Sequence, residues 1–65
     1  MNCELMERVV AGAGYHFSTA ATDGGIVACI YGSGGAITEE YFGDTFEEAM
    51  SLAFEEFTRN KRRAA

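Results

Sequence analysis

The fold of this chain is decided by residues 15–42, which read YHFSTAATDGGIVACIYGSGGAITEEYF. Three runs of strand-forming residues are separated here by two glycine-rich turns. The runs are 15–22, 26–31 and 36–42, and the turns are 23–25 and 32–35. Glycine-rich pairs between apolar runs are typical of tight β-hairpins. The stretch therefore predicts an antiparallel meander of three strands.

The two turns also predict the register of the meander. A two-residue Asp23-Gly24 loop pairs Ala21 with Ile26, and it pairs Phe17 with Ile30. A turn centred on Ser33-Gly34 pairs Tyr31 with Ala36 and Ile30 with Ile37. The predicted core face holds Phe17, Ala21, Ile26, Ala28, Ile30, Ile37 and Tyr41. The opposite face holds His16, Ser18, Ala20, Val27, Cys29, Tyr31, Thr38, Glu40 and Phe42.

One helix is predicted before the meander in the sequence and another after it. Residues 46–60 are predicted to form a helix whose start is marked by a capping box of Thr45 and Glu48. The helix has an apolar stripe, and Leu52 points away from it. That stripe is Phe46, Ala49, Met50, Ala53, Phe54 and Phe57. Residues 2–11 form a shorter helix with Asn2 as its N-cap and Gly12 and Gly14 at its end. Its apolar face is Leu5, Met6, Val9 and Val10.

The element order is therefore αβββα, an α+β fold in one domain spanning residues 1–65. Both helices are expected on one face of the sheet, leaving the other face to solvent or a partner. The basic tail, 59–65, is expected to fray.

The charge is distributed unevenly. The chain has a net charge of −5, but four of its five basic residues lie between Arg59 and Arg63. Residues 1–58 hold ten acids against Arg8 alone, a net of nine negative charges. Such a domain repels nucleic acid and anionic membranes. A basic protein surface is the expected partner.

Seven of the ten acids lie within residues 39–56. Acids near a helix start complement its dipole, which does not account for the acids at 39, 40, 55 and 56. A solvated surface that aids solubility and a surface directed at a partner are both compatible with those four. Helical spacing places Glu48, Leu52 and Glu55 on one face, and charges that repeat every ~5–6 Å along a helix resemble the separation of phosphates along a nucleic-acid strand. The predicted partner-binding residues are Glu39, Glu40, Asp44, Glu47, Glu48, Glu55 and Glu56.

No arrangement of residues indicates catalysis or a bound cofactor. His16 is the one histidine, and even with Cys29 nearby it lacks an orienting third group. Two Cys and one His lack zinc-site spacing, and Gly32-Ser33-Gly34-Gly35 is flanked by strands instead of opening a helix. We therefore expect no enzyme, metal or cofactor. The two cysteines and the absence of a signal-like segment predict reduced thiols in the cytoplasm.

A second interface is predicted on the outer face of the sheet. Val27, Tyr31 and Phe42 would be exposed there in a monomer. Aromatic side chains among polar groups are common interface anchors. This face could bind a partner or a second copy, so the sequence is compatible with a monomer or a weak homodimer.

One stretch resembles a known family. The run Gly43-Asp44-Thr45-Phe46-Glu47-Glu48-Ala49 opens a helix after a three-stranded meander. It is similar to the turn that opens the sheet-packed helix of HicB-type antitoxin domains, and about thirty residues share this likeness. The resemblance implies a module that binds a small toxin through its helix and sheet edge.

The profile of the whole chain resembles a different group. Its length, acidity, αβββα order and lack of active-site motifs are similar to phage-encoded anti-CRISPR proteins, especially the small acidic inhibitors of type I-C systems. The resemblance implies binding to a CRISPR surveillance complex in the bacterial cytoplasm and blocking of its access to target DNA. Such complexes hold nucleic-acid backbone with basic residues, for which an acidic protein surface can compete.

Overall fold

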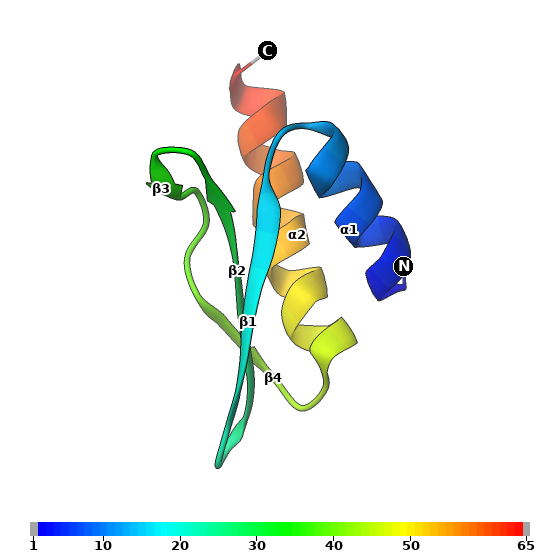
Figure 1. Cartoon of the computed structure of the whole chain (residues 1–65), viewed down its shortest axis with the longest axis vertical. Coiled ribbons are helices and arrows are strands. Elements are labelled where there is room, and N and C mark those ends of the chain that lie inside the picture. Colours follow the sequence, from blue (N-terminus) through cyan, green and yellow to red (C-terminus); the bar gives the residue numbers. More distant parts are fainter. Residues whose placement is uncertain (1, 65) are drawn as a thin grey trace.

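The structure is a computed structural model that describes the backbone of residues 2–64 and the side chains of residues 2–60. The two helices lie side by side on one face of an antiparallel sheet (Figure 1), as the sequence predicts. The elements are α1 (Cys3–Gly12), β1 (His16–Thr22), β2 (Gly25–Gly32), β3 (Gly35–Ala36), β4 (Tyr41–Gly43) and α2 (Phe46–Ala64). The α+β class and the arrangement of helices on one side of the sheet are confirmed.

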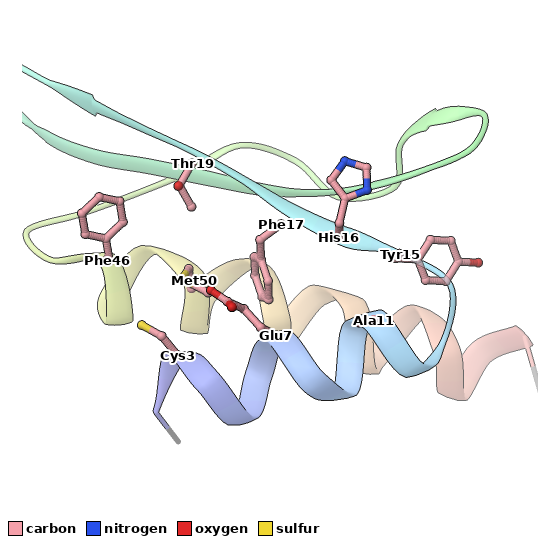
Figure 2. A pocket seen from close by; sticks show the side chains of 9 residues that line it. All are labelled: Cys3, Glu7, Ala11, Tyr15, His16, Phe17, Thr19, Phe46 and Met50. Atoms are coloured by element: carbon pink, nitrogen blue, oxygen red, sulfur yellow. The ribbon is translucent and has the colours of Figure 1, made fainter.

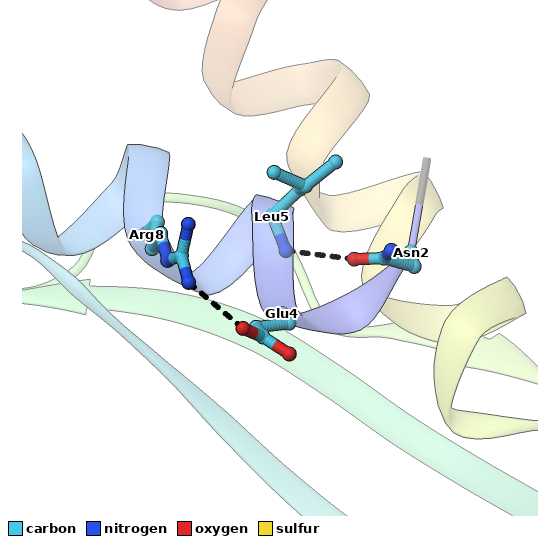
Figure 3. A network of polar contacts seen from close by, with 4 residues as sticks. All are labelled: Asn2, Glu4, Leu5 and Arg8. Atoms are coloured by element: carbon cyan, nitrogen blue, oxygen red, sulfur yellow. Dashed lines mark hydrogen bonds and ion pairs between the residues drawn. The ribbon is translucent and has the colours of Figure 1, made fainter.

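The first helix begins where its cap predicts but buries a narrower face. The side chain of Asn2 accepts a hydrogen bond of 2.8 Å from the backbone N–H of Leu5 (Figure 3). Met6 and Val10 are fully buried, whereas Leu5 and Val9 are almost half exposed. Only half of the predicted apolar face is therefore buried. Met6 and Val10 point into the core, and the residue before each lies about 100° away around the helix.

The predicted register of the β1–β2 hairpin is confirmed. Phe17 lies opposite Ile30 and Ala21 lies opposite Ile26. A mirror-image turn would give Asp23 and Gly24 positive φ angles, but the positive φ, +148°, belongs to Gly25, the first residue of β2. A Cβ at that position would also lie 2.6 Å from a backbone oxygen of Gly43.

The third predicted strand, 36–42, is interrupted. Ala36 pairs with Tyr31 and Tyr41 pairs with Ala28, so five steps along this strand correspond to three along β2. The two additional residues bulge out, and the sheet partner of Ile30 N–H becomes the Oγ1 of Thr38, 3.0 Å away. An insertion of two residues preserves side-chain alternation. The expected pairing of β3 with β2 therefore holds, and the strand splits into β3 and β4.

The second helix contributes more core residues than any other element and is longer than expected. It begins after Thr45, whose Oγ1 accepts a 3.1 Å hydrogen bond from the N–H of Glu48, and it continues to Ala64 instead of ending near residue 60. Phe46 is 49% exposed, so this member of the predicted apolar stripe is not buried. The remaining stripe packs with α1 and β2. The buried core is Met6, Val10, Ala28, Cys29, Ile30, Ala49, Met50, Ala53 and Phe57.

The predicted core face of the sheet is largely confirmed. Ala28 and Ile30 are fully buried, and four further members pack against the core while remaining partly accessible. Those four are Phe17, Ile26, Ile37 and Tyr41. Ala21 is exposed because the tip of the β1–β2 hairpin extends past the helices (Figure 1). Cys29, placed on the outer face by its register, is nevertheless buried.

Candidate binding surfaces

Six of the seven predicted partner-binding acids are exposed. They come from the segment between β3 and β4, the turn after β4, and α2. These residues are Glu39, Glu40, Asp44, Glu47, Glu48 and Glu55. Leu52, between Glu48 and Glu55 on the helix, is 37% exposed, as the predicted face requires. We call these six acids the acidic face.

Glu56 has a different environment from the other six acids. Its Oε1 accepts a 2.5 Å hydrogen bond from the hydroxyl of Tyr41 and a 3.2 Å bond from the backbone N–H of Glu39. Its Oε2 accepts a 3.3 Å bond from Asn60. The carboxylate is half-buried and ties the β3–β4 segment to α2. The structure therefore gives Glu56 an internal supporting role beneath the acidic face.

These hydrogen bonds move the pKa values of both partners. The bond from Tyr41 lowers the pKa of Glu56, and the donors from Glu39 and Asn60 and the charge of Arg59 lower it further, against an opposing effect of burial. The same bond raises the pKa of Tyr41. A proton on the tyrosine and a charge on the glutamate are thus mutually stabilised.

The acidic face is not neutralised by the described cations. Among the side chains of residues 2–60, the one ion pair joins Arg8 and Glu4 at 2.9 Å on α1 (Figure 3). Arg59 lies beside Glu39, Tyr41 and Glu56 around a shallow hollow of about 310 Å³. The remaining carboxylates face solvent, so their field extends outward over roughly one Debye length, about 8–10 Å at physiological salt.

The outer face of the sheet carries the second predicted set. Phe42 is 55% exposed, and Val27 lies opposite it on β2, half-buried. Tyr31 is also half-buried, and His16 stacks on its ring with centroids 6.0 Å apart. A hydrogen bond with Cys29 raises the pKa of Tyr31, and the nearby charge of Glu40 raises it further. Aromatic groups and one acid therefore meet on this face.

A third surface is a groove between α1 and β1 that the sequence did not predict. It has a volume of about 560 Å³ (Figure 2). Cys3 and Glu7 line it from α1, Phe17 from β1, and Phe46 and Met50 from α2. Phe17 points toward the helices and His16 points away. Phe46 lies at the first turn of α2, where an apolar residue in the stripe was expected to be buried.

His16 and Cys29, the two residues considered for catalysis, are not paired with each other in the β1–β2 register. His16 is opposite Tyr31 in the register, while Cys29 is opposite Ser18. Both cysteines are free thiols, with Cys3 half-buried and Cys29 buried. Among the described residues, no three His, Cys, Asp or Glu side chains gather closely enough to hold a metal ion.

Comparisons with known proteins add no assignment. No family model, curated protein or solved structure matches the chain. Neither helix, over its described residues, has the length and apolar character needed to cross a membrane. Functional inference for this protein therefore rests on its side chains and their arrangement.

Proposed function

We propose that this protein is a non-enzymatic inhibitor whose acidic face occupies a basic, nucleic-acid-handling surface of another protein. The observation that carries the proposal is the acidic face itself, six exposed carboxylates without a described cationic partner. Glu48 and Glu55 lie seven residues apart on α2, which is about 10 Å along the helix axis. Carboxylates held on a rigid helix present fixed negative charge, as a phosphate backbone does.

The support beneath the acidic face favours recognition over mere solubility. Glu56 fixes the β3–β4 segment through the N–H of Glu39 and fixes β4 through Tyr41. Glu39 is thereby held beside Glu56 instead of moving on a free loop. Preorganised charge loses less conformational entropy on binding than charge on a mobile segment. Phe42, exposed on the neighbouring outer face, supplies an apolar anchor for the same partner.

The resemblance of the chain to small acidic anti-CRISPR proteins names a specific partner to test. We propose that the partner is a type I-C CRISPR surveillance complex and that binding blocks its access to target DNA. Such complexes hold DNA through basic residues that track the backbone and read the PAM. Competition by an acidic protein is expected to weaken as salt rises, because salt screens the attraction.

The test uses a purified type I-C surveillance complex and a labelled target duplex. Wild-type protein should prevent duplex binding in a mobility-shift assay, and the double reversal Glu48→Lys/Glu55→Lys should lose this inhibition. The matched control is Glu4→Lys/Glu7→Lys, which changes the net charge equally but lies on α1 outside the acidic face. Circular dichroism should show that both variants are folded.

Each result has a distinct meaning. Loss of inhibition in the α2 variant alone supports recognition by the acidic face. Equal loss in both variants would show that net charge, and not this site, is responsible. A wild-type protein that leaves duplex binding unchanged would rule out the CRISPR complex as its partner.

A HicB-type antitoxin function is the second candidate, favoured by the turn between β4 and α2. Gly43 is buried there, and a Cβ on it would lie 2.6 Å from the backbone nitrogen of Ala49. Glycine at position 43 is thus required for close packing of strand and helix, and it lies in the part of the chain that resembles those domains. Co-purification with a small toxin encoded beside its gene would support this function, and lack of a complex would oppose it.

A further inference from the structure

The strand β1 lies at an open edge of the sheet. Within the described residues, β1 pairs with β2 alone, while β2 also pairs with β3 and β4 on its other side. The strand is seven residues long, His16–Thr22. An edge strand offers unpaired backbone N–H and C=O groups to any strand that can lie beside it.

The hydrogen bonds of Ile30 show which residues of β1 carry these free groups. Its N–H donates to Thr38 Oγ1 at 3.0 Å, and its C=O accepts from Ile37 N–H at 2.8 Å. Both groups of Ile30 therefore point away from β1, so Phe17 opposite it belongs to a non-hydrogen-bonded pair. The N–H and C=O of Phe17 point to the open edge. By alternation, those of Thr19 and Ala21 do the same.

The composition of the edge says what can approach it. Residues 16–22 contain no proline, lysine, arginine, aspartate or glutamate, the residues that commonly protect an edge strand. The acidic face lies across the sheet, around β3, β4 and α2. A strongly charged partner therefore has no charge on β1 to recognise. A neutral strand of the same kind is matched to it, and β1 of a second copy is such a strand.

We propose that β1 pairs antiparallel with β1 of a second copy, about a two-fold axis at Thr19. Thr19 then lies opposite its own counterpart, and Phe17 lies opposite the partner's Ala21. All three outward-facing positions of one strand meet the three of the other, so every free N–H in this set finds a C=O. The two sheets become one continuous sheet with the acidic faces at its two far ends.

The groove beside β1 fits this pairing. Phe17 and Thr19 line the groove from the helix side of the sheet, and the corresponding side chains of a paired strand project to that same side. They would cover the apolar surface of Phe46, which is 49% exposed, and of Met50. This burial adds an apolar contribution to the backbone hydrogen bonds. The unusual exposure of Phe46 is thereby explained.

The dimer interface does not depend on the proposed inhibitory function, and the salt dependence of binding distinguishes the two. Two copies repel each other because each carries a net charge of −5. Raising salt to about 1 M shortens the Debye length to about 3 Å and screens that repulsion. The dimer should therefore tighten with salt, whereas binding of the acidic face to a basic partner should weaken.

Sedimentation equilibrium of the full chain, over a wide concentration range and at low and high salt, tests the proposal. The wild type should form a dimer that tightens with salt. Thr19→Pro removes an outward N–H that β2 does not use, and Thr19→Asp places two like charges opposite each other at the axis. Each should weaken the dimer about tenfold or more. Ser33→Asp, which adds the same charge at the exposed β2–β3 turn, should not.

Amide hydrogen exchange supplies the second measurement. The amides of Phe17, Thr19 and Ala21 should become protected as protein concentration rises, and only in the wild type and Ser33→Asp. A wild type that stays monomeric at every salt overturns the proposal, as does a dimer that folded Thr19 variants leave intact. Dissociation by Phe42→Ser alone would assign the contact to the outer face instead. Protection of these amides only on addition of a different protein would assign the edge to a foreign strand.

Discussion

The hydroxyl of Tyr41 donates a hydrogen bond of 2.5 Å to Oε1 of Glu56, joining β4 to the middle of α2. The same oxygen accepts the N–H of Glu39, in the segment that interrupts the third strand. A charge-assisted bond of this kind is shorter and stronger than one between neutral groups. The carboxylate thus replaces sheet hydrogen bonding where β3 and β4 separate, and it positions Glu39 of the acidic face.

The importance of this carboxylate can be measured with two neighbouring glutamates. Glu56→Ala removes three hydrogen bonds and should lower the free energy of unfolding by about 1 kcal/mol or somewhat more. Glu55→Ala, whose side chain is exposed, should change it by less than about 0.5 kcal/mol. Urea denaturation followed by circular dichroism gives both values. Equal effects of the two substitutions would contradict the role given to Glu56.

The Tyr41–Glu56 bond should also give stability a pH dependence with two limits. The folded-state pKa of Glu56 is lowered from 4.5, so its contribution is complete above that value and is lost as pH falls through the folded-state pKa. The folded-state pKa of Tyr41 is raised from 10.0, so its contribution is complete below that value and is lost as pH rises through the folded-state pKa. Unfolding free energies of wild type and Glu56→Gln should converge in acid. A difference that stays constant throughout the acid range would contradict this assignment.

Thr38 makes the interruption of the third strand possible. Its Oγ1 accepts the N–H of Ile30 at 3.0 Å in a buried position. Thr38→Val keeps the shape but leaves that N–H without its acceptor, which should cost about 1–3 kcal/mol. Thr38→Ser keeps the hydroxyl and loses one methyl group, which should cost about 0.8 kcal/mol. Thermal unfolding should rank wild type above Ser above Val. A valine variant as stable as the serine variant would contradict the bond.

The parts of the fold that sequence predicted are those set by local rules. The two turns determine their flanking pairs, so Phe17 and Ile30 are found opposite each other as expected. The capping residue Thr45 and the spacing of Ala49, Met50 and Ala53 likewise follow from helix geometry alone. Because these signals lie within a few residues of one another, no tertiary information is needed to interpret them.

The features that sequence missed depend on contacts between distant segments. The bulge after Ala36 is held by the bond from Ile30 of β2 to Thr38 and by Glu56 of α2, seventeen residues beyond Glu39. No local propensity distinguishes Glu56 from Glu55, and only the position of Tyr41 does so. Phe46 belongs to the helical stripe by spacing, yet it lies beyond the cover that α1 provides and borders the groove. For the acidic face, charge clustering could be predicted, whereas its internal support could not.

The first residue of β2 offers the sharpest test of the hairpin geometry. Gly25 has a φ of +148°, and a Cβ there would lie 2.6 Å from the backbone oxygen of Gly43 on β4. Gly25→Ala should therefore destabilise the fold by about 1–3 kcal/mol through strain alone, with further loss from the clash. The matched control is Gly34→Ala in the second turn, where φ is not positive and a Cβ would meet nothing within 4 Å. That substitution should be neutral or stabilising by up to about 1 kcal/mol, because alanine restricts the unfolded chain. Chemical denaturation of both variants measures the difference. Two equally stable variants would mean that β2 begins with a backbone geometry any residue can adopt, and that the close approach of β4 is not required.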